Sequence, residues 1–191
     1  MAKISYKENV YVPVEELYRV DTGYRMSGGF NLSIQGLTAG ATVPPLAPIS
    51  VDKATRTATL LKRVRVLETG SSAKTLKVSK FSQVSAGSFL SNGTATLTVA
   101  SVDTSDKDFD LITAKADTSA FTIGAVLYEA TDASANKSKG VADYLIYAPT
   151  KVEDGATVTA LARAFEVQTG KLYIPLTEED KKGLTDRFIF V

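Results

Sequence analysis

The chain contains no cysteine, no histidine and no tryptophan. Without cysteine it has no disulfide, no thiolate metal site and no thiol nucleophile. Without histidine it lacks an imidazole base, a Ser-His-Asp triad and the commonest metal ligand. These absences exclude most hydrolases, oxidoreductases and zinc proteins, and we expect no cofactor. Carboxylate or lysine chemistry, a binding module and a structural protein remain.

Long apolar runs are also missing. The first eight residues do not resemble the apolar core of a signal peptide, and no stretch approaches the roughly 18 residues of a membrane span. The 191 residues carry 22 basic and 21 acidic side chains, and 44% of them are apolar. This composition indicates a globular domain with neither a membrane nor a nucleic acid as partner. We expect synthesis in a cytosol, followed by release through lysis or within an assembly.

Residues 1–40 differ from the rest of the chain. They hold four of the eight tyrosines, namely Tyr6, Tyr11, Tyr18 and Tyr24, and their apolar alternation is poor. We predict an extended arm with a short strand at residues 10–14. Tyrosines suit an arm that lies on a partner surface, because they give amphipathic contact area at a small entropic cost. The alternative is an arm that closes over its own domain.

From residue 41 onward, short apolar runs alternate with turn signals. Strands are predicted at residues 49–51, 75–78, 94–103, 108–115, 124–130, 141–148, 156–167 and 172–176. Residues 108–115 are predicted to form a hairpin with residues 94–103. A longer strand is predicted at residues 56–68, where Lys62 interrupts the apolar face and suggests a bulge. Strands at this spacing, without long amphipathic helices between them, predict a mainly β body.

One helix is predicted near the C-terminus. Thr177 is a suitable N-cap, and Glu178, Glu179 and Asp180 follow it where the helix dipole favours acids. Lys181 and Lys182 then precede Gly183, which we expect to stop the helix. A last strand is predicted at residues 188–191, with its apolar terminus tucked in.

The acidic side chains offer two candidate sites, and neither is convincing. The spacing of Asp106, Asp108 and Asp110 resembles the start of an EF-hand loop, but Leu111 stands where that loop needs a sharply turning glycine. Alternation along a strand explains the segment better. Neighbouring Glu178 and Glu179 point about 100° apart on a helix and cannot form a facing acid–base pair.

The balanced charge conceals two oppositely charged segments. Residues 52–80 carry eight basic and two acidic side chains, whereas residues 103–132 carry seven acidic and two basic ones. The segments can pair across one sheet or meet between subunits, and we favour the second arrangement. The predicted subunit contacts are Arg63, Arg65, Asp106, Asp108 and Asp110.

Several patches together resemble one protein family. They are Gly124-Ala-Val-Leu-Tyr-Glu, Val141-Ala-Asp-Tyr-Leu-Ile-Tyr, the acidic loop and Ala/Val-rich strand from Val152 to Ala164, Leu176-Thr-Glu-Glu-Asp and Phe188-Ile-Phe-Val. In this order they resemble the capsid decoration and head fiber proteins of tailed phages. Residues 41–68 resemble the opening of the family domain, and residues 69–119 look like an insertion of β hairpins.

The resemblance implies a barrel-like or tulip-like β body with one short C-terminal helix and an extended N-terminal arm. It divides the chain into an arm at residues 1–40, which contacts the capsid, and a body at residues 41–191. The expected function is that of a non-enzymatic virion protein on the capsid exterior, made in the bacterial host cytoplasm. The expected partners are the major capsid protein and further copies of the chain, with a homotrimer favoured.

Two alternatives remain open. A carbohydrate- or cell-surface-binding β module would stack sugars on exposed aromatics such as Tyr144 and Tyr147. A carboxylate-based enzyme would need two acids within about 5–10 Å of each other in a cleft.

Overall fold

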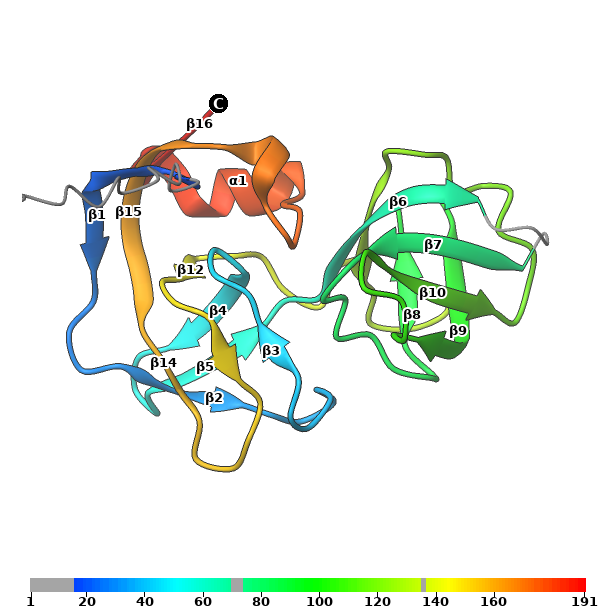
Figure 1. Ribbon diagram of the computed structural model, residues 1–191, viewed down its shortest axis with the longest axis horizontal. Helices are drawn as coiled ribbons and strands as arrows, with labels where there is room; N and C mark the ends of the chain where they lie inside the picture. Colours follow the sequence, from blue (N-terminus) through cyan, green and yellow to red (C-terminus); the bar gives the residue numbers. More distant parts are fainter. Residues whose placement is uncertain (1–15, 70–73, 135–136) are drawn as a thin grey trace, which may run out of the picture.

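The long strand predicted at residues 56–68 is two strands in two different sheets of the computed structural model. The model describes residues 16–69, 74–134 and 137–191. Strand β5 (Thr57–Leu60) belongs to one sheet and β6 (Arg63–Thr69) to another. The bulge prediction is therefore wrong, because the chain leaves one hydrophobic core at Leu60 and enters a second at Val64. Figure 1 shows the resulting two lobes side by side.

The first lobe, here called the body, contains residues 16–62 and 130–191. Its strands are β1 (Arg19–Arg25), β2 (Phe30–Ser33), β3 (Thr42–Val43), β4 (Pro48–Asp52), β5, β12 (Tyr144–Ile146), β13 (Thr150–Lys151), β14 (Thr157–Val158), β15 (Ala160–Val167) and β16 (Phe188–Phe190). The main sheet has the order β1-β15-β12-β4-β5-β2-β14, with β16 parallel to β15 and β2 parallel to β5. Strands β3 and β13 form a separate pair.

Hydrophobic cores cover both faces of the central strand β12. Tyr144 and Ile146 belong to one core, and Leu145 between them belongs to the other. All three residues are buried, as the period-2 geometry of a strand requires when both faces are covered. Leu184 of the C-terminal helix packs in the same core as Leu145, so the helix closes that side of the sheet.

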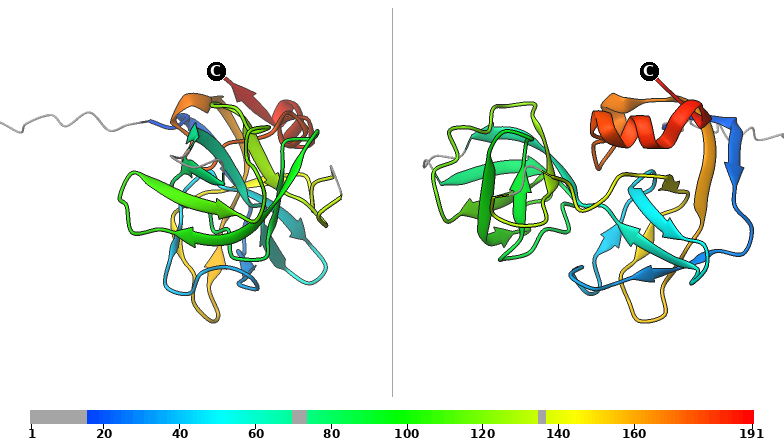
Figure 2. Two further views of the ribbon diagram at one scale, coloured as in Figure 1. Left: turned by 90° about the vertical axis from the view of Figure 1, so that its right-hand side faces the viewer. Right: turned by 180° about the vertical axis from the view of Figure 1, so that it is seen from behind.

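The second lobe, here called the barrel, spans residues 63–129. Its strands are β6, β7 (Thr75–Ser79), β8 (Phe89–Ser91), β9 (Thr96–Asp103), β10 (Phe109–Ala114) and β11 (Val126–Glu129). They close in the order β10-β7-β6-β11-β8-β9, which leaves no free sheet edge. Alternate residues such as Leu76, Val78, Leu97 and Val99 fill the interior. Figure 2 shows from behind that the barrel is inserted between two connections to the body.

Most of the predicted elements are confirmed. The structure is mainly β, β9 and β10 form the predicted hairpin, and a single α-helix lies near the C-terminus. The strand predicted at residues 172–176 is wrong. Leu172, Ile174 and Leu176 do alternate into the cores, but Pro175 has no N–H for a ladder and the segment pairs with no described strand. The strand predicted at residues 10–14 lies outside the described residues.

The predicted N-terminal arm lies on the body from Arg19 onward. Strand β1 pairs with β15, and β2 pairs with both β5 and β14 inside the main sheet. Phe30 and Leu32 of β2 are buried in the body core. The boundary expected at residue 40 therefore does not separate an arm from a body in the described part of the chain.

The C-terminal helix α1 (Glu178–Leu184) begins with a capping box. The Thr177 hydroxyl accepts from the Asp180 backbone N–H at 3.1 Å, and the Asp180 carboxylate accepts from the Thr177 backbone N–H at 3.1 Å. Gly183 does not stop the helix as predicted, since the helix runs one residue further. A Cβ at position 183 would lie 2.5 Å from the carbonyl oxygen of Ala142. The glycine is therefore needed for close packing.

The apolar C-terminus is not fully tucked in as predicted, because Phe188 is buried but Val191 is exposed.

Substituting alanine for Gly183 is expected to lower the free energy of unfolding by about 1–2 kcal/mol. An alanine normally stabilises a helix interior, but here its methyl group would overlap backbone that cannot move freely. The measurement is thermal or urea unfolding. Gly170→Ala is the matched control, because a Cβ there meets no atom within 4 Å. Equal stability of the two variants would contradict the packing role of Gly183.

Candidate functional site

A buried ion pair joins the barrel to the body. Arg63, the first residue of β6, donates from Nε to Asp180 Oδ2 at 2.8 Å and from Nη2 to Asp180 Oδ1 at 3.0 Å. Both side chains are almost completely inaccessible. Arg63 also donates to the carbonyl oxygens of Lys62 and Gly140, which lie on the two connections between the lobes. One guanidinium therefore contacts both connections and helix α1.

The carboxylate of Asp180 is saturated with donors. Besides Arg63 it accepts from the backbone N–H of Ala142 at 3.0 Å and from the Thr177 hydroxyl at 2.8 Å. Burial acts to raise the pKa of this carboxyl. The hydrogen bonds and charge of Arg63, together with Thr177, outweigh burial and hold the pKa below its ordinary value of 3.8. The aspartate is therefore charged across the neutral pH range.

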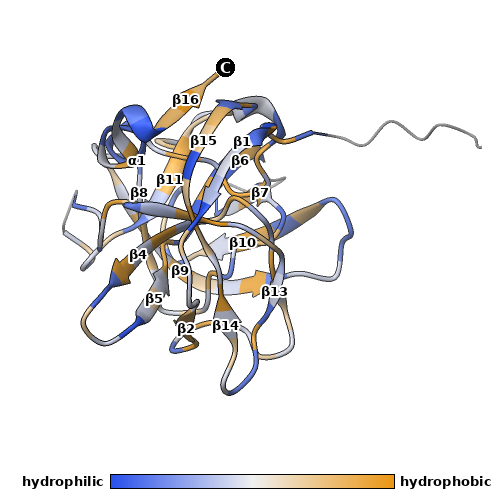
Figure 3. Cartoon of the chain, turned by 90° about the vertical axis from the view of Figure 1, so that its left-hand side faces the viewer, coloured by the Kyte–Doolittle hydropathy of each residue, from blue (hydrophilic) through white to orange (hydrophobic). Residues whose placement is uncertain are grey.

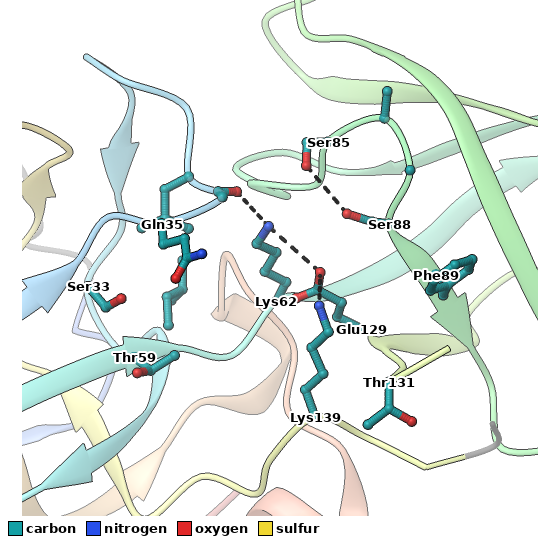
Figure 4. A pocket seen from close by; sticks show the side chains of 15 residues that line it. Ser33, Gln35, Thr59, Lys62, Ser85, Ser88, Phe89, Glu129, Thr131 and Lys139 are labelled. Carbon is teal, nitrogen blue, oxygen red and sulfur yellow. Dashed lines mark hydrogen bonds and ion pairs between the residues drawn. The ribbon is translucent and has the colours of Figure 1, made fainter. Parts of the chain in front are cut away.

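A cleft of about 680 Å³ opens between the two lobes. Figure 4 shows Ser33, Gln35 and Thr59 on the side of the body, and Ser85, Ser88 and Phe89 on the side of the barrel. Lys62, Glu129 and Lys139 lie between these walls. Since the walls come from different lobes, the position of the barrel on the body sets the width of the cleft.

The three charged groups of the cleft form a chain. Glu129 Oε1 lies 2.8 Å from Lys139 Nζ and 3.9 Å from Lys62 Nζ. Lys62 is buried and donates from Nζ to the carbonyl oxygen of Gly36 at 2.6 Å. Burial lowers the pKa of Lys62, and Glu129 acts in the opposite direction. The cleft therefore presents a cluster of donors and acceptors in which two ammonium groups share one carboxylate.

A lysine occupies the centre of the acidic loop that resembles a calcium site. Lys80 Nζ donates to the carbonyl oxygens of Thr104 at 2.7 Å and Asp106 at 2.6 Å, and it lies 2.8 Å from Asp110 Oδ1. The contact between Lys80 and Asp110 is an ion pair whose geometry is not that of a hydrogen bond. Asp110 Oδ1 therefore has no hydrogen-bond partner within the described residues. Within residues 16–69, 74–134 and 137–191, no group of three or more acidic side chains is arranged to hold a metal ion.

The charged segments pair within the chain. Strand β7 of the basic segment pairs with β10 of the acidic segment, and β6 pairs with β11. Arg63 is buried against Asp180 and Asp110 is buried beside Lys80, so neither is available as the subunit contact predicted from the sequence. Asp106 and Asp108 are exposed and Arg65 is half-buried, and their role in a subunit contact stays a prediction.

The tyrosines predicted to contact the capsid fall into three groups. Tyr6 and Tyr11 lie outside the described residues. Tyr18 is half-buried and packs against the core beneath helix α1. Tyr24, on the edge strand β1, is 61% exposed. Of the two tyrosines that the structure describes, Tyr24 is therefore the more exposed.

Tyr24 is one of four exposed apolar side chains on the strands that pair with β15 and at the C-terminus. They are Val20 and Tyr24 on β1, Ile189 on β16 and Val191. We call this set of residues the β1 end surface. Both strands pair with β15, and Figure 3 looks onto this end of the molecule. Figure 1 places β1 on the side of the body away from the barrel.

The aromatic residues proposed to stack on sugars are poorly placed for that role. Tyr144 is buried, with the Arg187 guanidinium 5.0 Å and the Lys53 ammonium 5.6 Å from its ring centroid. Arg25 lies 4.7 Å from the ring centroid of Tyr147. Cationic groups of the same chain therefore already contact both rings.

The sequence did not single out Asp180 or the group of Lys62, Glu129 and Lys139. The sequence identified Asp180 only as an acid in the first turn of a helix. Its capping-box position was the only sign of a further role, which is the ion pair with Arg63. Lys62 had a sequence signal, since it interrupts an apolar strand. Its partner Glu129 lies 67 positions away, and no local sequence pattern relates residues at that separation.

No helix in the described parts of the chain is long and apolar enough to span a membrane.

Comparison with known proteins gives one match. A family model described as head fiber protein matches residues 2–190, which is nearly the whole chain. No curated protein and no solved structure gives a significant match. The match includes both lobes and the connections between them.

Proposed function

The chain belongs to the head fiber protein family of phages, and from this premise we propose that it binds the outer surface of the capsid through the major capsid protein. It is a structural phage head protein, and the proteins of its family are virion components. The family match over residues 2–190 is the observation that carries the proposal. The protein would be made in the host cytoplasm and assembled onto heads there.

The shape of the chain supports one orientation on the head. The β1 end surface and the barrel lie at opposite sides of the body (Figure 1). The β1 end surface carries exposed apolar side chains beside an edge strand, and both features favour contact with another protein. With this end on the capsid, the barrel would project outward. Residues 1–15 would join the contact, as the tyrosine-rich sequence suggests.

A passive binding role also agrees with the chemistry of the described residues. The buried carboxylates of Asp180 and Asp110 are paired with Arg63 and Lys80. Glu129 is flanked by two lysines. Each of these carboxylates is engaged by a basic side chain of the same chain, which suits a structural role, and we propose no catalytic activity.

Co-sedimentation with phage heads that lack this protein tests the proposal. We expect the purified chain to pellet with the heads in a saturable manner, and to remain in the supernatant when heads are omitted. Heads pre-saturated with unlabelled protein are the control for specific binding. Failure to pellet at any concentration, with the protein folded, would contradict attachment to the head surface.

We further propose that the protein assembles as a homotrimer. The free edge of β1 and the exposed apolar side chains beside it support self-association or capsid contact. Light scattering is expected to give about three times the chain mass of 20.4 kDa, in solution or after release from heads. A mass of one chain at high concentration, together with isolated single copies on the head, would contradict the trimer.

A further inference from the structure

We propose that the cleft between the lobes binds a short saccharide chain. This inference goes beyond attachment to the head, because the cleft lies between the body and the barrel and not on the β1 end surface. Its volume of about 680 Å³ lies within the range of small-molecule sites, about 300–1,000 Å³. Three features of the cleft favour a saccharide: the neutral polar groups on its walls, the charged cluster between them and one aromatic ring.

Neutral hydrogen-bonding groups line both walls. Ser33, Gln35 and Thr59 stand on the body side (Figure 4), and within the described residues no group bonds to the side chains of Gln35 or Thr59. On the barrel side, the hydroxyl oxygens of Ser85 and Ser88 lie 3.4 Å apart, and neither hydroxyl bonds to another group of the described residues. Hydroxyl and amide side chains both donate and accept, which matches the many hydroxyl groups of a sugar.

The charged cluster adds a donor and an acceptor side by side. Lys139 Nζ and Glu129 Oε1 are 2.8 Å apart, with Lys62 Nζ behind them. A pair of neighbouring sugar hydroxyls can donate to the carboxylate and accept from the ammonium at the same time. Because Glu129 lies beside both ammonium groups, a neutral polyol can bind without separating these ion pairs. The formal excess of one positive charge is small for attracting a polyanion. The cluster therefore favours a saccharide over a nucleic acid, which needs an extended basic groove.

Phe89 supplies an apolar surface in the same cleft. It is the first residue of β8 and is half-buried on the barrel side of the cleft (Figure 4). The C–H face of a pyranose ring packs against an aromatic ring, while its hydroxyls reach polar groups around the rim. Tyr144 and Tyr147 cannot provide this surface, since cationic side chains of the same chain contact their rings.

The test is an array of oligosaccharides derived from bacterial surface polysaccharides, probed with the full chain. We expect a defined subset to bind. Isothermal titration with the best-bound oligosaccharide then compares the chain with its variants Phe89→Leu and Gln35→Ala. Each variant is expected to weaken binding about tenfold and to keep the unfolding temperature within a few degrees.

Phe109→Leu is the matched control. Phe109 is also half-buried on a barrel strand, but it does not line the cleft. Binding by Phe109→Leu should equal that of the unchanged chain. The proposal is overturned if no oligosaccharide binds, or if Phe89→Leu and Gln35→Ala bind as tightly as the control. Co-sedimentation with heads is read separately, so a failure here leaves the proposed head attachment intact.

Discussion

Replacing Arg63 by alanine is expected to lower the free energy of unfolding by roughly 3–5 kcal/mol, because it leaves the buried carboxylate of Asp180 without its counter-charge. For a chain of this length the unfolding temperature should fall by about 6–20 °C. Two backbone carbonyl oxygens on the lobe connections, those of Lys62 and Gly140, lose a donor as well. Denaturant unfolding followed by circular dichroism measures the effect.

Arg65→Ala is the matched control for this prediction. Arg65 lies two positions along the same strand, but its side chain is only half-buried and no ion pair of Arg65 is among those found in the described residues. The control should cost about 1 kcal/mol or less. If Arg63→Ala were as stable as Arg65→Ala, the ion pair could not be what holds the barrel on the body.

The same ion pair predicts a dependence of stability on acid pH. The pKa of Asp180 is lower in the folded chain than its ordinary value of 3.8. A lowered folded-state pKa contributes stability that is fully present above the unfolded pKa and is lost as pH falls through the folded pKa. The stability difference between the unchanged chain and Asp180→Asn should therefore shrink as the pH is lowered below about 4. A difference that stays constant from pH 7 to pH 2 would contradict this assignment.

Deleting residues 1–15 is expected to abolish binding to phage heads while leaving the chain folded. The deletion keeps every strand and core residue described above, so the unfolding temperature should change little. Under the proposed function, however, it removes Tyr6 and Tyr11 from the capsid contact. Loss of an aromatic-rich segment from an interface of ordinary size should weaken binding by a factor of about 100 or more. Co-sedimentation with heads gives the bound fraction.

A longer deletion provides the contrast. Removing residues 1–40 also removes β1 and β2, and with β2 the buried side chains of Phe30 and Leu32. Loss of these two side chains alone should cost several kcal/mol, so this variant is expected to unfold. If the chain without residues 1–15 still bound heads with unchanged affinity, the capsid contact would have to lie elsewhere, with the β1 end surface as the next candidate.

Local patterns predicted the elements whose partners are close in the sequence. The hairpin of β9 and β10 followed from alternation around a turn, and helix α1 from a capping residue followed by acids. The strand predicted at residues 172–176 does not form, because alternating burial arises whenever an extended segment packs on a core. Ladder pairing is a separate requirement, and the segment with Pro175 does not meet it.

The division into two lobes depends on pairings that are distant in the sequence. Arg63 and Asp180 are 117 positions apart, and no local feature of either residue specifies the other. Lys62 did disturb its apolar strand, but a bulge and a passage between two sheets give the same pattern. The cleft could not be predicted for the same reason, because its walls come from segments that meet only after the barrel has folded onto the body.

Immunogold labelling of intact virions tests the central claim most directly. Antibodies raised against the barrel, residues 63–129, would be applied to undisrupted phage particles and viewed by electron microscopy. Attachment to the outer capsid surface predicts gold particles over the heads of intact virions, and none on particles from a phage that lacks the gene. Gold on tails only, or on heads only after the particles are broken open, would contradict it.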